Sequence, residues 1–564
     1  MPDGAAARND LFASHPDALD FQPGHRVEPL IGGQQTYKAL EEAISEARQS
    51  VHMAYWTLDP TTKTTGDVGV DTLGELLRDV VKRGVDLRIV VADFDPVIAT
   101  MYHVTAWRAY RQLIELVSSA APNYQDHFAI MCSRHDTRWG PVGRTAAQPI
   151  LHYKLAEKVA ALNDLPTIEK RKERLGEMPG LWPFVTFSNG KAATRPLIYP
   201  GFYPAAHHEK LCVIDDRIVF LGGLDITEKR RDDWDHENEH PWHDVACKLE
   251  GPAATFFARH FRSRWNEERE EFHAFLNAIE PPEGVPPLPP QPETPVLPTD
   301  VQPAEAIPDG TEVRPLRTLS KQSRSWFSRS PRTVISEIRD CYLELIGEAR
   351  DFIYIENQYL RSTQIAEALA RQAERAKKLE LILILPLMAE DAFVEKDPNI
   401  ATRHGQYLQE KNTDILRDAF GDRLGIFAML MPGEERLPDP EEADPKEIIE
   451  STVYIHAKTM ICDDKLAIIG SANLNDRSLV TDTETAIVWR GEETVRPYRL
   501  ALWEHALDLK TDDWTTDHLA RWKQIAIANV RGDPEARSGF IVPFPRRHLD
   551  AHARKSWLVP DELV

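Results

Sequence analysis

The alternation of apolar and polar positions predicts a strand–helix–strand unit near the start of this chain. In residues 35–49 apolar side chains recur at helical spacing, and residues 51–58 (VHMAYWTL) form a run rich in β-formers. A helix over residues 67–83 then leads through a glycine into an apolar strand over residues 85–92. This order is the unit from which parallel and mixed α/β sheets are built.

The same order returns in the second half of the chain. Residues 350–360 (RDFIYIENQYL) are predicted to form a strand, residues 363–378 a helix, and residues 379–385 (LELILIL) an apolar strand. The repeat is too long for a solenoid, and 564 residues exceed what one core usually holds. Two related domains are therefore expected, with the extra residues of the longer first half between Val97 and Pro204.

Composition shifts mark the domain boundaries. Residues 1–28 are polar and punctuated by proline, and we expect a flexible arm there. Residues 281–314 are dense in proline, acidic and without periodicity, which is typical of an extended, semi-rigid linker. The predicted domains are residues 29–280 and residues 315–564, one on each side of this linker.

Each half carries one copy of the spacing H-x-K-x-x-x-x-D, followed by a Gly-Gly or a Gly-Ser turn. Residues two apart on a strand point the same way, so the histidine and lysine of each copy can face one cavity. Two imidazoles beside two ammonium groups suit a phosphate: one histidine attacks phosphorus, the other protonates the leaving oxygen, and the lysines offset the developing charge. One copy alone would be weak evidence, because a surface strand can carry H-x-K by chance. Two full copies, each followed by a Gly-Gly or Gly-Ser turn, indicate a catalytic role. The six residues are His208, Lys210 and Asp215 in the first copy and His456, Lys458 and Asp463 in the second.

A nucleophilic histidine needs an acceptor at its far ring nitrogen. The two motif aspartates lie an odd number of positions from their histidines, so they point to the opposite strand face and are expected to be structural. Better candidates stand at the next strands, Asp244 in PWHDVACKLEG and Glu484 in TDTETAIVW. We expect Asp244 to hold His208 and Glu484 to hold His456; an ordinary carboxylate at a strand edge is the alternative.

The stretch DWDHENEHPWHD, residues 233–244, combines three histidines with several carboxylates. His236 and His240 are four apart, a spacing that can suit a metal. However, the stretch has no apolar helical pattern, and Pro241 follows at once. Because the two H-x-K pairs already account for phosphoryl chemistry, we favour a polar loop at the cavity mouth and predict no metal ligands.

Charge and cysteine content narrow the function classes. The chain carries 67 Lys and Arg against 89 Asp and Glu, a net charge of −22, which disfavours a general nucleic-acid binder. Five well-separated cysteines argue against a disulfide framework. The N-terminus lacks the apolar core of a signal peptide, and no window encodes a membrane span. A cytoplasmic location is therefore the default expectation.

Two aromatic loops precede the first motif, LWPFVTF at residues 181–187 and YPGFYP at residues 199–204. Apolar aromatic loops beside a phosphate site are able to touch lipid. The equally favoured alternative is that they pack on the helices of their own insertion, since most aromatic side chains are core.

The two motifs, together with IENQYL, PWHD followed by CKLEGPAA, FRSRW and IIGSANLNDRS, resemble the phospholipase D superfamily, in particular its eukaryotic-type members. These signatures span most of residues 51–489. The resemblance implies an α/β fold of two homologous α/β/α sandwich domains, related by a pseudo-twofold axis, with the active site at their interface. It also implies a phosphohistidine intermediate on His208 and a chemical step that requires no cofactor.

The resemblance also assigns residues to the phosphate site. Asp225, in the Gly-Gly-Leu-Asp turn, departs from the superfamily's usual asparagine, as it does in eukaryotic-type members, and we group it with the structural motif aspartates. The positions assigned to the phosphate site are His208, Lys210, His456, Lys458, Ser471 and Asn473.

The expected activity is hydrolysis of glycerophospholipids of the phosphatidylcholine or phosphatidylethanolamine type to phosphatidic acid and a free headgroup alcohol, with transphosphatidylation to other alcohols. A nuclease of the same superfamily is the first alternative and a non-catalytic lipid-binding protein the second. The expected partner is a phospholipid membrane surface, the expected state a monomer, and no nucleic acid is expected. Stimulation by divalent cations is left open. Export by a signal-less secretion system, as an effector with an immunity partner, is the alternative to a cytoplasmic location.

Overall fold

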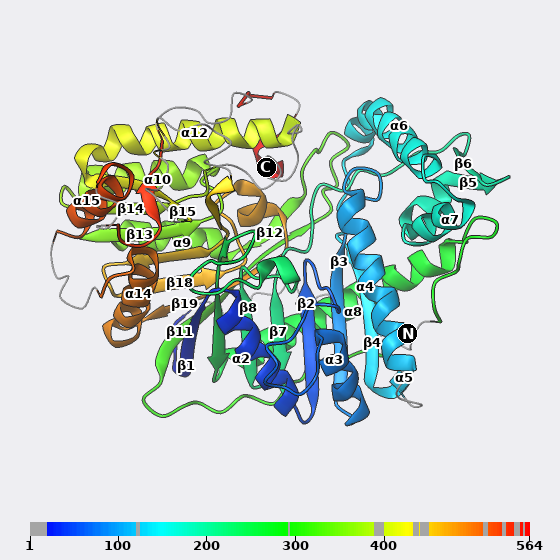
Figure 1. Ribbon diagram of the computed structural model, residues 1–564, viewed down its shortest axis with the longest axis horizontal. Helices are drawn as coiled ribbons and strands as arrows, with labels where there is room; N and C mark the ends of the chain where they lie inside the picture. Colours follow the sequence, from blue (N-terminus) through cyan, green and yellow to red (C-terminus); the bar gives the residue numbers. More distant parts are fainter. Residues whose placement is uncertain are drawn as a thin grey trace.

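Two halves of the same design lie side by side in the computed structural model (Figure 1). Each half is a mixed sheet with helices packed on it. The fold is therefore α/β with two homologous α/β/α sandwich units, as the sequence predicted. The described residues are 20–119, 124–290, 294–387, 400–431, 439, 441, 450–510, 517–532, 537–545, 553–556 and 559–564.

The first half begins with β1 and ends with the long helix α8. Helix α3 shows how sequence sets an element: Thr72 and Glu75 form a capping box at its start, and its leucines and valines at helical spacing are buried. The elements are β1 (Gln22–Ile31), α2 (Gly33–Glu46), β2 (Ser50–Tyr55), α3 (Leu73–Lys82), β3 (Asp86–Asp93), α4 (Thr100–Ser118), α5 (Tyr124–His127), β4 (Phe128–Arg134), α6 (Pro141–Asn163), α7 (Ile168–Gly176), η2 (Pro179–Phe184), β5 (Val185–Ser188), β6 (Lys191–Thr194), β7 (Leu211–Ile214), β8 (Ile218–Gly222), η3 (Glu228–Arg230), β9 (Trp242–His243), β10 (Val245–Glu250) and α8 (Ala253–Ala278).

The second half repeats this order, with β13, β14 and β15 in the places of β2, β3 and β4. Its elements are β11 (Thr311–Lys321), β12 (Arg332–Ser336), α9 (Glu337–Glu348), β13 (Phe352–Asn357), α10 (Thr363–Arg375), β14 (Glu380–Ile384), α12 (Ile400–Phe420), η4 (Gly421–Arg423), β15 (Leu424–Leu430), β16 (Thr452–Ile455), β17 (Lys458–Cys462), β18 (Leu466–Gly470), η5 (Arg477–Thr481), β19 (Glu484–Arg490), α14 (Glu492–Leu507), α15 (His518–Arg531), β20 (Ile541–Pro543) and η7 (Asp561–Leu563).

The two sheets share one strand order. In the first half the neighbours run β1–β10–β8–β7–β2–β3–β4, and in the second β11–β19–β18–β17–β13–β14–β15. Parallel pairs join the strands linked by helices, and the remaining pairs are antiparallel, among them the hairpins β7–β8 and β17–β18. Strands β1 and β11 pair with each other, which fuses the two sheets into one. The halves therefore meet through a short strand pairing that joins Gln22 with Val313 and His25 with Thr311.

Two expectations about segment boundaries need correction. Strand β1 starts at Gln22, inside the expected arm of residues 1–28, and residues 1–19 lie outside the described part of the chain. Strand β11 starts at Thr311, inside the expected linker of residues 281–314. The physical reason is the β1–β11 pairing, which satisfies backbone groups of both segments.

The linker itself packs against the first half and is not a free spacer. Leu297 and Val301 are buried, and the side chain of Asn266 on α8 bonds both backbone groups of Leu297, at 2.7 and 2.8 Å. The extra residues of the first half form α6, α7, η2 and the hairpin β5–β6, which stand out beside α4 (Figure 1). They fall inside the range Val97 to Pro204 that the sequence indicated.

Candidate active site

The two H-x-K pairs lie at the start of the central hairpins of the two sheets. Lys210 directly precedes β7 and Lys458 begins β17, and both strands are buried along their whole length. The residue between the first pair, Glu209, points the other way and meets His260 (2.8 Å) and Arg264 on α8. Alternation along the chain therefore sends His208 and Lys210 to the junction between the halves and Glu209 into the first half.

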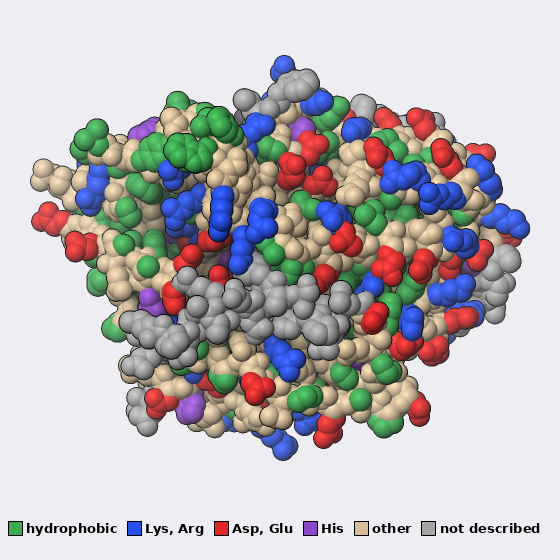
Figure 2. Space-filling model, turned by 180° about the vertical axis from the view of Figure 1, so that it is seen from behind, with side chains coloured by type: hydrophobic (Ala, Val, Ile, Leu, Met, Phe, Trp, Pro, Cys, Tyr) green, Lys and Arg blue, Asp and Glu red, His purple; other side chains and the backbone are tan. Residues whose placement is uncertain are grey.

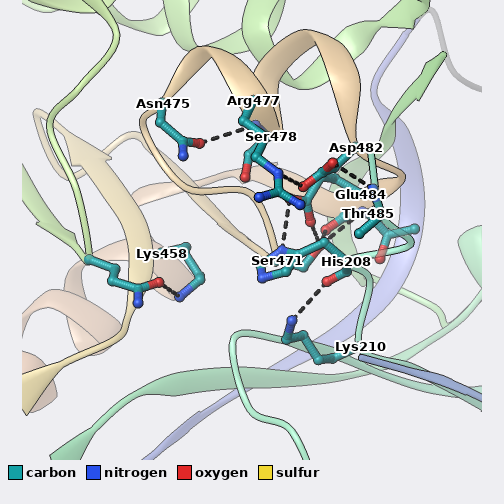
Figure 3. A network of polar contacts seen from close by, with 12 residues as sticks. His208, Lys210, Lys458, Ser471, Asn475, Arg477, Ser478, Asp482, Glu484 and Thr485 are labelled. Atoms are coloured by element: carbon teal, nitrogen blue, oxygen red, sulfur yellow. Dashed lines mark hydrogen bonds and ion pairs between the residues drawn. The ribbon is translucent and has the colours of Figure 1, made fainter. Parts of the chain in front are cut away.

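Each histidine of the two H-x-K motifs is hydrogen-bonded to a carboxylate from the opposite half. His208 Nδ1 lies 2.8 Å from Glu484 Oε1, and His456 Nδ1 lies 2.6 Å from Asp244 Oδ2 (Figure 3 shows the first pair). The four residues are those that the sequence selected, but the predicted pairing of Asp244 with His208 and of Glu484 with His456 is wrong.

The crossed pairing follows from backbone contacts between the halves. The amide of His208 donates to the carbonyl of Thr483 at 2.9 Å, next to Glu484. In the other half, the amide of His456 donates to the carbonyl of His243 at 2.8 Å, next to Asp244. These are parallel bridges between the halves, β9 with β16 and residue 207 with residue 483. Each histidine is thereby set beside the strand start of its partner half.

Burial and nearby ammonium groups keep both imidazoles neutral. Burial, Lys210 and Lys458 hold the pKa of His208 well below its usual value. Burial, Lys458 and Arg230 do the same for the pKa of His456. A neutral imidazole that donates its Nδ1 proton to a carboxylate has a free lone pair on Nε2. Both histidines are thus in the state that a nucleophile or a general base requires.

The two carboxylates are themselves tuned by burial. Burial raises the pKa of Glu484 to about 7, against Lys210 and a hydrogen bond from Ser471, which lower it. Burial likewise raises the pKa of Asp244 to about 6. Ionisation of these groups therefore falls near neutral pH, where it controls which nitrogen of each histidine carries the proton.

The lysines are as buried as the histidines. Lys210 Nζ lies 3.5 Å from Asp225 Oδ2 and donates to the backbone oxygen of His208 at 2.8 Å. Lys458 Nζ lies 3.4 Å from Gln358 Oε1, and burial lowers the pKa of Lys458 to about 7. Gln358 belongs to the IENQYL signature, but no spacing in the sequence identifies it as a neighbour of the second lysine.

The motif aspartates anchor backbone turns away from the reacting groups. Asp215 accepts from the amides of residues 48, 49 and 50, at 2.7 to 3.2 Å. Asp463 accepts in the same way from the amides of residues 350, 351 and 352, at 2.8 to 2.9 Å. Asp225 also has a structural contact, because its Oδ1 accepts from the amide of Thr57 at 2.8 Å. This agrees with the odd spacing of the motif aspartates from their histidines.

The glycine turns bring the site together. Ser471 donates to Glu484 Oε2 and accepts from the amide of Thr485 at 3.1 Å (Figure 3). On the other side, a Cβ at Gly223 would lie 2.1 Å from Asp244 Oδ1, so only glycine leaves room for that carboxylate. Ser471 thus supports a histidine partner, and Asn473 holds a buried Oδ1 that has no hydrogen-bond partner among the described residues.

Residues 233–244 are not simply a polar loop at a cavity mouth, so that expectation is wrong in part. His240 is exposed, but His236 and His243 are buried and bonded to carboxylates, His236 to Asp232 at 2.6 Å and His243 to Glu356 at 2.7 Å. This stretch is charged, contains no glycine and shows no apolar periodicity, so its sequence does not indicate that two of its histidines are buried. His236 and His240 do not lie together as the two ends of a helical turn.

An aromatic group borders the first histidine. The Trp56 ring packs edge-on against His208, with centroids 4.7 Å apart, and Phe94 and Tyr102 pack on Trp56. The two aromatic loops, for which lipid contact and packing within the insertion were equally favoured, behave differently. In residues 181–187 the large side chains Leu181, Trp182 and Phe187 are buried in the core of the insertion, whereas Tyr199 of the second loop is 46% exposed.

The arrangement is suited to two-step displacement at phosphorus. Two imidazoles present free Nε2 atoms, each is fixed by a buried carboxylate, and each has an ammonium group two positions away. The charges of the two lysines act on both histidines, which places all four groups within one electrostatic site. Nucleophile, general acid and anion-binding charges are therefore all present.

Comparison with known families gives two matches. A model described as "Phospholipase D" matches residues 235–384, and one described as "Cardiolipin synthase, PLD-like domain" matches residues 342–505. Among the described helices, none combines the length and the apolar content needed to cross a bilayer.

Known proteins similar to this chain include plant and yeast enzymes. Phospholipase D alpha 3 of Arabidopsis thaliana is 27% identical over 56% of this chain and 50% of its own length. Phospholipase D1 of Schizosaccharomyces pombe is 26% identical over 57% of this chain and 29% of its own length. The chain thus spans half or less of the length of these relatives. The crystal structure of phosphatidylserine synthase from Haemophilus influenzae Rd KW20 is 14% identical, with 89% of each chain covered and a TM-score of 0.49.

Proposed function

The chain belongs to the phospholipase D superfamily, and from this premise we propose that it is a phospholipase D that hydrolyses glycerophospholipids to phosphatidic acid and a free headgroup alcohol. The observation that carries the proposal is the pair of neutral, carboxylate-held histidines, each with its own lysine, at the junction of the two halves. Relatives named phospholipase D support the same reaction.

In the first step His208 is the nucleophile. Its Nε2 lone pair attacks phosphorus while Glu484 accepts a hydrogen bond from Nδ1–H. A P–Nε2 bond forms as the P–O bond to the headgroup breaks. Of the two imidazoles, His208 is the more accessible, with a side chain 12% exposed against 4% for His456. Charge on the phosphoryl oxygens is offset by Lys210 and Lys458.

His456 delivers the proton that the departing alkoxide needs. The site without substrate favours neutral His456, because of burial and the nearby cations. A bound phosphodiester is anionic and offsets those cations, so it raises the pKa of His456 and allows the imidazolium to form, with Asp244 accepting a hydrogen bond from Nδ1–H. Substrate binding therefore charges the acid that the first step uses.

The second step reverses these roles. His456, now neutral, takes a proton from water, the hydroxide oxygen attacks phosphorus, and the P–Nε2 bond to His208 breaks to release phosphatidic acid. A primary alcohol in place of water gives the transphosphatidylated lipid by the same route. A covalent intermediate thus predicts two products whose ratio depends on the alcohol concentration.

A lipid surface fits the exterior of the molecule better than nucleic acid. The net charge of −22 opposes binding to a polyanion in solution. The loop between β11 and β12 is an exception, since the loop and the strand residues that flank it, residues 321–332 (KQSRSWFSRSPR), carry four cations and no acid. In this loop Trp326 and Phe327 are 70% and 76% exposed. Aromatic side chains among cations suit the interface of an anionic membrane.

This aromatic loop is connected to the active site. It leaves β11 shortly after Thr318, which pairs with Glu484 on β19. The loop rests on the start of α6, where the amides of Gly140 and Val142 donate to the carbonyls of Ser328 and Trp326. Figure 2 shows hydrophobic side chains gathered at one upper corner of the molecule, with Lys and Arg side chains beside them.

The proposal is tested with purified protein, vesicles of mixed phospholipids and some ethanol. Phosphatidic acid together with phosphatidylethanol is the expected product pair, and it is lost in His208→Ala and in His456→Ala. A phosphate adduct trapped on His456 in place of His208 would reverse the assigned roles. If lipid is untouched and DNA is cleaved by the wild type alone, the superfamily nuclease takes the place of the phospholipase.

Monomeric state, independence of the chemical step from metal, stimulation by divalent cations, and export as an effector stay predictions from the sequence.

A further inference from the structure

Three buried histidines converge beside the active site but outside the groups that the reaction uses. They are His236 in the loop before β9, His243 on β9 and His505 near the end of α14. Their exposed fractions are 1%, 0% and 2%, and one ring nitrogen from each lies within 4.8 Å of the other two. Histidines this deeply buried need a partner for each ring nitrogen.

Each ring has such a partner on one side only. His236 Nδ1 meets Asp232 at 2.6 Å, His243 Nε2 meets Glu356 at 2.7 Å, and His505 meets the backbone carbonyl of Trp234. The three nitrogens that remain are His236 Nε2, His243 Nδ1 and His505 Nδ1, and none of them has a hydrogen-bond partner among the described residues. Because the outer nitrogens are engaged, these are the nitrogens available to a ligand where the three rings converge.

The outer acceptors determine where the protons sit. An acceptor on the far nitrogen holds the N–H there, which leaves a lone pair on the facing nitrogen. Three buried ring nitrogens without a partner are costly to leave unsatisfied. One cation would satisfy all three, and an inner imidazole with an outer carboxylate or carbonyl is the arrangement that metal-binding histidines adopt.

Charge at this place also favours a cation. The carboxylates of Asp232 and Glu356 touch two of the three rings, and Asp244 follows His243 directly. A ligand set of three neutral imidazoles suits zinc and related transition metals rather than calcium or magnesium, which prefer oxygen.

We propose that His236 Nε2, His243 Nδ1 and His505 Nδ1 bind one divalent transition-metal ion of the zinc class, with one coordination position left for water or another small ligand. His236 and His243 belong to the first half, and His505 and the outer ligand Glu356 belong to the second. The ion therefore ties the halves together at their junction. It positions the backbone of Asp244, the residue that holds His456, without touching the reacting atoms.

The test is the metal content of the protein expressed in zinc-supplemented medium and purified without a metal-affinity step. Elemental analysis is expected to find one equivalent of zinc per chain in the wild type. His505→Gln and His236→Gln should lower metal affinity by about tenfold or more. His240→Gln is the matched control, because His240 lies in the same stretch but is exposed, and it should retain the metal.

A spectroscopic readout separates lost ligands from lost folding. Wild-type protein stripped of metal and titrated with Co²⁺ should show the strong visible bands of tetrahedral cobalt, with saturation at one equivalent. Chelation should also lower the Tm of the wild type and of His240→Gln. Wild-type protein that holds no zinc, shows no tetrahedral cobalt spectrum and keeps its Tm in chelator would overturn the proposal. All these readouts are independent of lipid hydrolysis, so they stand or fall separately from the proposed function.

Discussion

Glu484 links burial, charge and catalysis at one position. Its carboxylate is fully buried, touches His208 in the other half and accepts from Ser471. When it is ionised it accepts a hydrogen bond from Nδ1–H of His208, which leaves the lone pair on Nε2 free. When it is protonated it donates to Nδ1 instead, so the imidazole must carry its proton on Nε2 and cannot attack.

Activity should therefore depend on the ionisation of Glu484. Because burial raises the pKa of this group to about 7, kcat/KM is expected to rise with pH through about pH 7, as the carboxylate forms. Glu484→Gln cannot ionise, so this acid-side limb should disappear and kcat should fall by roughly 10²- to 10⁴-fold. A pH–rate profile measured on vesicles checks both effects.

Glu492→Gln is the control for this substitution, because Glu492 is an exposed carboxylate on α14 and should leave the profile unchanged. An intact limb near pH 7 in Glu484→Gln would assign that ionisation to another group.

At the scale of single elements, the turn after β8 decides the position of Asp244. A Cβ at Gly223 would lie 2.1 Å from Asp244 Oδ1 and 2.8 Å from its Cγ, far inside contact distance. Gly223→Ala should thus displace the carboxylate that holds His456. We expect kcat to fall by about 10²-fold, since small misplacements of catalytic groups have effects of that size.

The matched control is Gly347→Ala on α9, where an added Cβ meets nothing within 4 Å. This change should leave kcat unaltered and stabilise the helix slightly, by roughly 0.5 to 1 kcal/mol. Equal kinetics in the two alanine variants would show that the contact between Gly223 and Asp244 is not limiting.

The β11–β12 loop is the element that we expect to enter the membrane interface. Trp326→Ala combined with Phe327→Ala removes two large exposed apolar side chains and should weaken binding to anionic vesicles by roughly tenfold or more. Turnover of a short-chain lipid below its micelle concentration should be unchanged, because neither side chain contacts the reacting groups.

Ile527→Ala on α15 serves as the comparison, since Ile527 is 51% exposed but lies on a different element. Vesicle co-sedimentation measures the binding of all variants. If the Trp326 and Phe327 variant binds as tightly as Ile527→Ala, the loop is not the membrane contact.

At the scale of the whole molecule, the linker between the halves acts as a strap. It follows α8, bonded to Asn266, Trp265 and Arg262, and buries Leu297 and Val301. Exposed linkers are easily cut by proteases, but a segment held against the protein in this way should resist them. Wild-type protein should therefore be cleaved only slowly between residues 294 and 310.

Asn266→Ala removes both hydrogen bonds to Leu297 and should release this part of the strap. Limited proteolysis with mass spectrometry is expected to show faster cleavage there, while kcat stays near that of the wild type because the β1–β11 pairing still joins the halves. An unchanged cleavage pattern would mean that the buried apolar side chains alone hold the strap.

Local patterns in the sequence were enough to predict one strand–helix–strand unit in each half and the reacting residues. Apolar periodicity predicted the strand–helix–strand unit of each half, because these elements bury one face or both. The spacing H-x-K placed the histidine and lysine of each copy on one side of the chain, and odd spacing separated the motif aspartates from them. These properties depend only on neighbours along the chain.

The tertiary structure alone decided how the halves complete each other. His208 and Glu484 are 276 positions apart, and His456 and Asp244 are 212 positions apart, so no local spacing relates them. Their contacts depend on how the two halves dock through the bridge of β9 with β16 and the bridge of residue 207 with residue 483. The convergence of three histidines from a charged loop, a short strand and a distant helix depends on the same docking, because side-chain meetings across an interface are encoded by the shape of both surfaces.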